Sequence, residues 1–487
     1  MNSVSADSLR QNIILVFITC GLLLFLGLSA RELSDDEAVI AFRAKATAGK
    51  SAWTDQSAFT PGGVMNATQA PLQVWAEMLF VRTAGWTKPF MLRVWSVLCG
   101  VAALVLVYRI AAYRLPPSEA LAAPVLLAGS LVWNDVARSA ISAVPVVTFL
   151  LLAFVAAIEA TAGTPVHASG AADPWRRRAW SCVYAVAVCC SLLLDTVFGC
   201  MALVLLLGVR RRGVRELLFG AIAGVLLSLP WFVHMTVLHG SPALRAALAS
   251  SLLLRDAAGV PVGAGVMNLT GLIASQPLVI IAIIGLALSW RRGRSEDESH
   301  AGSAQETMLR VWAVAGMALC ALPVPGHVAV VFVVPVLAIL AVTQRTSVFR
   351  TASSTRMLTG AFLFLLLLVL VRIVTYAGSI HHPDADLSVL SVVSALFLAT
   401  GAARIIPRHR VSRFNGFMIR QTRMLVPALL VIHCGWYNTS ASGELRDGAK
   451  EVSAWLEQSQ QRMFTVLVDS ENPADTLVPQ LAWYTQG

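Results

Sequence analysis

Long runs of apolar residues dominate the chain and limit what it can fold into. Clear examples cover residues 12–30, 269–290 and 357–376. At about 1.5 Å rise per residue, a helix over each run crosses a hydrocarbon layer of about 30 Å. Of the 487 residues, 57% are hydrophobic and only 13% are charged, which excludes an ordinary soluble globular domain. We therefore predict an all-α polytopic membrane protein.

The first apolar run, 12–30, has two interpretations. Arg10 precedes it and the small residues Ser29 and Ala30 end it, as in a cleaved signal peptide. The run is longer than the apolar region of about 7–15 residues that is usual in a signal peptide. Its length favours a retained membrane anchor.

The positive charge of the chain is distributed in a way that orients it. The formal net charge is +10, and arginines gather in short gaps that alternate with gaps nearly free of basic residues. This alternation follows the positive-inside rule, so the basic gaps are expected in the cytoplasm and beside anionic lipid headgroups rather than on a nucleic acid. The basic gaps are 176–178, 210–215, 291–294, 345–356 and 404–423.

These patterns predict about 13 spans, with the N-terminus in the cytoplasm and the C-terminus outside. The expected spans are 12–30, 89–113, 118–134, 143–161, 179–194, 197–209, 217–239, 269–290, 308–322, 327–343, 357–376, 387–403 and 424–437. Residues 197–209 are few for a span, so half of a re-entrant pair is the alternative there. The expected organisation is a transmembrane domain, 1–437, followed by a short outer C-terminal segment, 438–487, which is too small for a core of its own.

The outer loops 31–88 and 240–268 are the largest within the transmembrane domain. The first carries two helix-like stretches, 35–48 and 71–83. In the second stretch the apolar residues recur at intervals of three and four, which gives the helix one apolar face and predicts that it lies along the membrane surface. These apolar residues are Leu72, Trp75, Met78 and Leu79.

Three consecutive carboxylates, Asp35, Asp36 and Glu37, follow the first span directly. One interpretation is a helix N-cap, with Ser34 or Asp35 capping a helix whose first turn is acidic. The other is a chemical role, because clustered carboxylates repel one another unless a cation, a donor or a general-base function compensates. Local sequence alone leaves both open.

Several short motifs follow one another along the chain. They are Asp36-Glu37-Ala38, Pro71-Leu72-Gln73-Val74-Trp75, the spaced set Arg93, Ser96 and Gly100, then Arg138 with Pro145, Leu229-Pro230-Trp231 and Val334-Pro335. This order and spacing resembles the C-type (GT-C) glycosyltransferases that use polyprenyl-phosphate-linked sugars, in the branch of the lipid A aminoarabinose transferases and protein O-mannosyltransferases. The chain departs from the family pattern at Gln69-Ala70 and at Ala143.

The resemblance implies a GT-C fold and an inverting transfer of a sugar from a polyprenyl-phosphate donor to a lipid, glycan or protein acceptor. It implies that Asp36 is the general base, with Asp35 as the alternative if the match slips by one residue and Glu37 as the third acidic member of the site. On the same basis Pro71, Trp75 and Arg93 are expected in the acceptor and loop region.

Outer arginines are the expected partners of the donor phosphate, because a guanidinium holds phosphate oxygens bidentately. Arg138, Arg245 and Arg255 are the best placed. Each of them has an alternative role as an interfacial residue whose head group reaches toward water.

A divalent metal ion is a possible cofactor. His381 and His382, with Asp384 and Asp386 close by, lie in a predicted outer connection and could coordinate such an ion. Adjacent histidines in an extended segment point to opposite sides, so an ordinary polar connection is the alternative.

Two other functions compete with the transferase. A transporter or flippase for a lipid-linked glycan would carry ionisable residues in its spans and paired halves, and Arg372 is the one clear charge deep in a late span. A non-catalytic member of the same fold is the second alternative, because the departures at Ala70 and Ala143 fall in the matched motifs. We expect a multi-pass protein of the cytoplasmic membrane whose active site opens to the outer side.

Overall fold

The computed structural model describes residues 71–84, 89–128, 130–161, 174–208, 214–240, 300–321 and 326–350, with single positions between 14 and 47. All secondary-structure elements in these ranges are helices. They are α3 (Pro71–Ala84), α4 (Pro89–Ala112), α5 (Pro117–Ala120), α6 (Ala122–Ala128), α7 (Leu131–Ala137), α8 (Ala143–Thr161), α9 (Pro174–Leu194), α10 (Thr196–Gly199), α11 (Met201–Val204), the 3₁₀ helix η3 (Leu205–Gly208), α12 (Val214–His239), α16 (His300–Ala321) and α17 (Gly326–Arg350).

The helices confirm the positions of several predicted spans. Of those described, four are long and apolar enough to cross a membrane, namely α4, α8, α9 and α12, and each coincides with a predicted span. Helices α16 and α17 likewise cover the spans predicted at 308–322 and 327–343. Several helices begin at a proline, which lacks the N–H that a first helical position would leave unused. The later predicted spans, from 357 onward, and the span at 269–290 lie outside the described residues.

The spans predicted at 118–134 and 197–209 are wrong as continuous helices. The first is divided into α5, α6 and α7. Ser130 separates α6 from α7: it is extended, and its hydroxyl accepts a hydrogen bond from the Trp133 N–H at the start of α7. The second is divided into α10, α11 and η3. Before this segment, Asp195 separates α9 from α10: it is extended, and its carboxylate accepts a hydrogen bond of 2.9 Å from the Phe198 N–H as the N-cap of α10.

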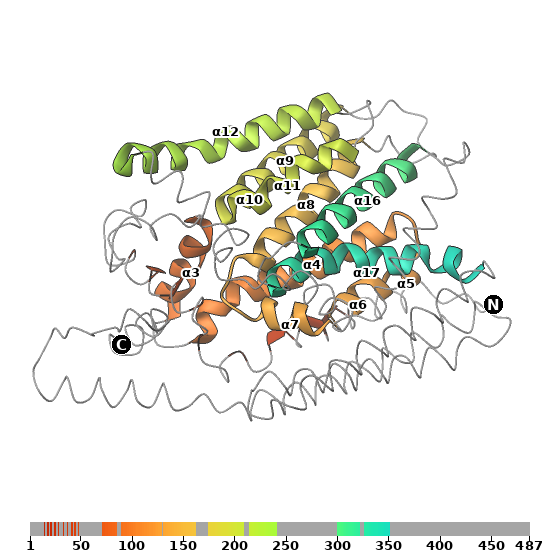
Figure 1. The fold of residues 1–487 in the computed structure, drawn as a ribbon, viewed down its shortest axis with the longest axis horizontal. Helices are drawn as coiled ribbons and strands as arrows, with labels where there is room; N and C mark the ends of the chain where they lie inside the picture. The colour runs from red at the N-terminus through yellow and green to blue at the C-terminus, as the bar shows by residue number, and fades with distance from the viewer. Residues whose placement is uncertain are drawn as a thin grey trace, which may run out of the picture.

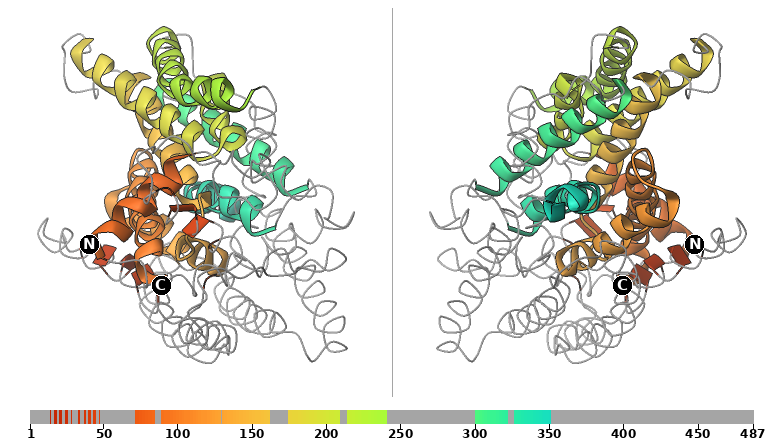
Figure 2. Two further views of the ribbon diagram at one scale, coloured as in Figure 1. Left: turned by 90° about the vertical axis from the view of Figure 1, so that its left-hand side faces the viewer. Right: turned by 90° about the vertical axis from the view of Figure 1, so that its right-hand side faces the viewer.

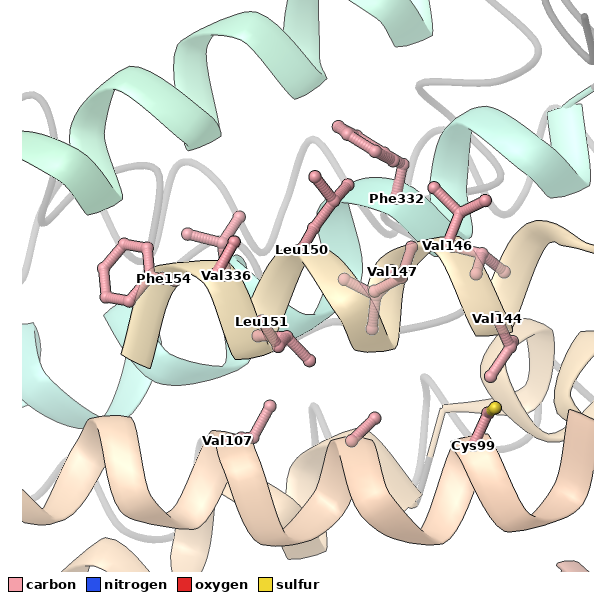
Figure 3. Packing of buried hydrophobic residues seen from close by; sticks show 14 of the residues in the cluster. Cys99, Val107, Val144, Val146, Val147, Leu150, Leu151, Phe154, Phe332 and Val336 are labelled. Atoms are coloured by element: carbon pink, nitrogen blue, oxygen red, sulfur yellow. The ribbon is translucent and has the colours of Figure 1, made fainter. Parts of the chain in front are cut away.

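The long helices lie in the order α12, α9, α8 and α4 across the molecule, with α16 and α17 against this row (Figures 1 and 2). Helix α8 is the most enclosed of the four membrane-length helices, because 89% of its apolar segment is buried inside the protein. Figure 3 shows its valines and leucines between Val107 of α4 and Phe332 of α17. Because lipid is as apolar as these side chains, close packing rather than transfer from water holds such helices together.

Polar side chains add hydrogen bonds between the packed helices. The Thr148 hydroxyl of α8 donates to the Cys99 carbonyl of α4 at 2.9 Å. The Trp312 indole of α16 donates to the Phe332 carbonyl of α17 at 3.1 Å. Such bonds satisfy polar groups that have no water partner inside the membrane and fix the register of one helix against another.

Candidate active site

A buried ion pair joins the loop after the first span to α4. The Arg93 guanidinium donates to both Glu37 oxygens, from Nε to Oε1 at 2.7 Å and from Nη2 to Oε2 at 2.9 Å. The two residues are only 2% and 1% exposed. This fork-to-fork geometry is the strongest arrangement available to an arginine and a carboxylate.

Two further hydrogen bonds support this ion pair. Arg93 Nη1 donates to the Leu28 carbonyl at 2.6 Å, and the Ala140 backbone N–H donates to Glu37 Oε1 at 2.7 Å. The set formed by Glu37, Arg93, Leu28 and Ala140, called the Glu37 clamp below, therefore joins the end of the first span, the following loop, α4 and the α7–α8 turn. A buried charge is tolerated when its hydrogen-bonding capacity is used in this way.

The spacing Arg93, Ser96, Gly100 now has a physical explanation. Residues at i, i+3 and i+7 share one face of a helix, and this face of α4 lies against the clamp and the α7–α8 turn. The Ser96 hydroxyl donates to the Ile141 carbonyl at 3.3 Å. A Cβ at Gly100 would lie 3.1 Å from Leu24 Cδ1, so glycine permits the close approach of the first span.

Arg138 lies in the same region. It is the C-terminal cap of α7, its side chain is 5% exposed, and it precedes by two residues the Ala140 N–H that binds Glu37. Sequence positions 37, 93 and 138 are thus brought to one end of the bundle. The predicted residues Asp35, Asp36, Arg245, Arg255, His381 and His382 lie outside the described residues.

Helix α3 confirms the predicted helix over 71–83, with the buried Pro71 at its start and Trp75 half-buried. Leu79, on the predicted apolar face, is 60% exposed, so that side is free to meet lipid; contact with the membrane surface stays a prediction. The face that packs against the protein carries the polar side chains of Gln73 and Glu77 beside Val74 and Met78.

Glu77 is a site residue that sequence reasoning missed. It is fully buried, and Gln73 Nε2 donates to its Oε1 at 2.6 Å. Within the described part of the chain, Glu77 Oε2 and Gln73 Oε1 have no hydrogen-bond partner. Burial, and secondarily the nearby Glu37 carboxylate, raises the pKa of Glu77 well above its usual value. The available signal was a polar pair at i and i+4 within an otherwise apolar helix.

Comparison with known proteins supplies the fold family. No protein-family model and no curated protein sequence matches the chain. Its structure is similar to that of ArnT from Cupriavidus metallidurans bound to undecaprenyl phosphate, with a TM-score of 0.67 and 14% identity, over 97% of this chain and 84% of that one. The chain has the GT-C fold. This confirms the resemblance inferred from the sequence motifs.

A second GT-C enzyme agrees. The Archaeoglobus fulgidus oligosaccharyltransferase tethered with an acceptor peptide matches with a TM-score of 0.54 and 14% identity, over 95% of this chain and 60% of that one. The same archaeal enzyme, AglB, in complex with an inhibitory peptide and a dolichol-phosphate matches with a TM-score of 0.52 and 12% identity. At these identities the likeness establishes a GT-C membrane fold, and activity has to be argued separately.

Proposed function

We propose that this GT-C protein is an inverting glycosyltransferase that moves a sugar from a polyprenyl-phosphate donor to a hydroxyl of a lipid, glycan or protein. The fold likeness to two enzymes whose structures hold undecaprenyl phosphate or dolichol-phosphate carries this proposal. The site would face the outer side of the cytoplasmic membrane, as the arginine distribution predicts.

In the proposed reaction Asp36 removes the proton from the acceptor hydroxyl. The acceptor oxygen then attacks the anomeric carbon from the side opposite the phosphate, and the bond between that carbon and the phosphate oxygen breaks. The polyprenyl phosphate leaves with the bonding electron pair and Asp36 holds the proton. In the transition state, the Asp36 carboxylate stabilises the positive charge that develops on the sugar. An arginine stabilises the negative charge that develops on the leaving phosphate.

The Glu37 clamp supports this assignment. Glu37 follows Asp36 directly, and both of its carboxylate oxygens accept hydrogen bonds from Arg93, with Oε1 also accepting one from Ala140. We assign Glu37 and Arg93 as positioning residues, which hold the backbone next to the base in one place. Arg138, two residues from Ala140, is the proposed phosphate-binding cation on this side of the site, and Arg245 and Arg255 are further candidates.

In the part of the chain that the structure describes, no three His, Cys, Asp or Glu side chains are grouped so that they could hold a metal ion. A divalent metal site at His381 and His382, outside the described residues, stays a prediction.

The test is sugar release from a labelled polyprenyl-phosphate donor by the full-length protein in liposomes. Asp36→Asn is expected to abolish release and Asp35→Asn to retain most of it, with Glu216→Gln, in the first turn of α12, as a control for loss of a carboxylate elsewhere. Full activity of both aspartate variants would refute the proposed base. Movement of the intact labelled donor between leaflets, without release, would instead identify a flippase.

A further inference from the structure

A second charged cluster lies at the far end of α4 from the Glu37 clamp. Glu159 of α8, whose side chain is 5% exposed, accepts from Arg109 Nη2 at 2.6 Å on one oxygen and from Arg176 Nη2 at 2.6 Å on the other. The Tyr113 hydroxyl also donates to Glu159. One buried carboxylate thus positions two arginines from two different helices, and the Glu159 cluster, made of Glu159, Arg109, Arg176 and Tyr113, keeps a net positive charge.

The two arginines of this cluster are held but not covered. Their side chains are 49% and 50% exposed, so each guanidinium has N–H groups directed away from Glu159. The Arg109 guanidinium also lies over the Trp180 ring, 5.5 Å from its centroid, which fixes its plane. The two guanidiniums are bound to the same carboxylate, one to each of its oxygens.

An exposed apolar strip along α4, called the apolar lane below, ends at Arg109. The exposed positions Leu98, Ala102, Val105 and Arg109 follow one another at intervals of four, three and four residues, and therefore share one face of the helix. Beside the other arginine, Trp175 is 75% exposed at the start of α9. Exposed aromatic residues of this kind sit at the level of lipid headgroups.

The position along the bundle agrees with a membrane surface. Arg109 follows Arg93 by sixteen residues in the same straight helix, a distance of about 24 Å along its axis. This is close to the thickness of the hydrocarbon layer, so the Glu159 cluster and the Glu37 clamp belong to opposite faces of the membrane.

We propose that the Glu159 cluster is a binding site for the phosphate of an anionic phospholipid in the leaflet opposite the candidate active site. The two guanidiniums bind the headgroup phosphate, and one acyl chain lies along Leu98, Ala102 and Val105. The apolar lane and the exposed tryptophan favour a lipid over a soluble phosphate. The site differs from a general basic belt because buried Glu159 preorganises its arginines.

The test measures retention and affinity of phosphatidylglycerol by native mass spectrometry of the full-length protein, after delipidation and addition of defined lipid. The variant Arg109→Gln/Glu159→Gln/Arg176→Gln removes the cluster without leaving a buried unpaired charge. Its matched control is Arg177→Gln/Arg178→Gln, which removes two arginines from the same turn of α9 and lowers the net charge further. Gel filtration and the thermal unfolding midpoint establish that both are folded.

The cluster variant is expected to bind phosphatidylglycerol about tenfold more weakly than the control, a difference of about 1.4 kcal/mol, because it lacks both positioned guanidiniums. Equal loss in both variants would overturn the proposal in favour of a general basic belt. Equal retention of phosphatidylcholine would overturn the requirement for an anionic headgroup. Displacement of the lipid by millimolar inorganic phosphate, added to the wild-type protein, would identify a soluble phosphate as the ligand and overturn the lipid assignment.

Discussion

Removal of Arg93 should show how strongly the Glu37 clamp holds the first loop. The substitution Arg93→Met leaves the Glu37 carboxylate, which is 1% exposed, without its bidentate partner. Loss of one member of a buried ion pair typically costs about 3–5 kcal/mol, because the other charge stays buried and uncompensated. Glu37→Leu should cost a similar amount, since the buried Arg93 guanidinium then loses its bidentate carboxylate partner.

The double variant Glu37→Leu/Arg93→Met separates the ion pair from the rest of the clamp. It leaves no buried charge, so its loss of stability should be smaller than the sum of the single losses by about 2–3 kcal/mol. The variant Arg93→Lys keeps the positive charge but cannot bind both Glu37 oxygens side by side as a guanidinium does. The free energy of unfolding should therefore fall by about 1.5–3 kcal/mol, through the loss of one charge-assisted hydrogen bond.

The measurement is the free energy of unfolding of the purified full-length protein, from titration of mixed micelles with denaturing detergent. The control is Arg82→Met, which alters an exposed arginine in the last turn of α3. Additive single losses, or a stability of Arg93→Met equal to that of the control, would refute the clamp. Sugar release measured on the same samples should fall with Arg93→Met if the clamp positions the loop that carries Asp36.

Three further outcomes follow from buried groups. The raised pKa of Glu77 means that the folded protein binds the Glu77 proton more tightly than the unfolded chain does. The stability of the fold should therefore fall as the pH rises above about 4.5, the ordinary pKa of a glutamate. The variant Glu77→Gln should remove this fall of the unfolding midpoint with rising pH. Gly100→Leu should lower stability by about 1–3 kcal/mol, because a Cβ there already meets Leu24 at 3.1 Å, and normal stability would contradict the close packing of the first span. Trp312→Phe removes the hydrogen bond to the Phe332 carbonyl and should lower stability by about 0.5–1.5 kcal/mol; an unchanged unfolding midpoint would mean that this bond contributes nothing.

Part of the candidate site was predictable from local sequence. Glu37, Arg93 and Arg138 lie in the motifs that resemble the GT-C pattern, and the structure brings these three positions to one end of the bundle. The role of Asp36, which lies outside the described residues, stays a prediction. Glu77 did not stand out, because a glutamate in a helix of a solvated loop is usually exposed. Its burial depends on which face of α3 meets the protein: of the predicted apolar face, Met78 is buried beside Glu77 whereas Leu79 is exposed.

The pairing of charges was also beyond local sequence. Glu37 and Arg93 are separated by 56 positions, and Glu159 and Arg109 by 50. The arginine-rich gap at 176–178 predicted a cytoplasmic surface, but not that Arg176 shares a buried carboxylate with an arginine of another helix. Such contacts depend on how spans pack sideways, and spans that are apolar all round carry no signal for that.

Sequence by itself determined that the chain lies in a membrane, where its main helices run and which GT-C enzymes it resembles. The reason is that a hydrocarbon layer accepts only long apolar helices, and such segments are visible in one dimension. Only the tertiary structure decided that the segments at 118–134 and 197–209 are broken and that, of the four membrane-length helices described, α8 is the most enclosed. It also decided that Glu37 and Glu159 each bind arginine from another helix. These features arise from packing and hydrogen bonding between segments far apart in the chain. Whether a residue is buried or paired there depends on the partner that it meets, and the local sequence does not contain that partner.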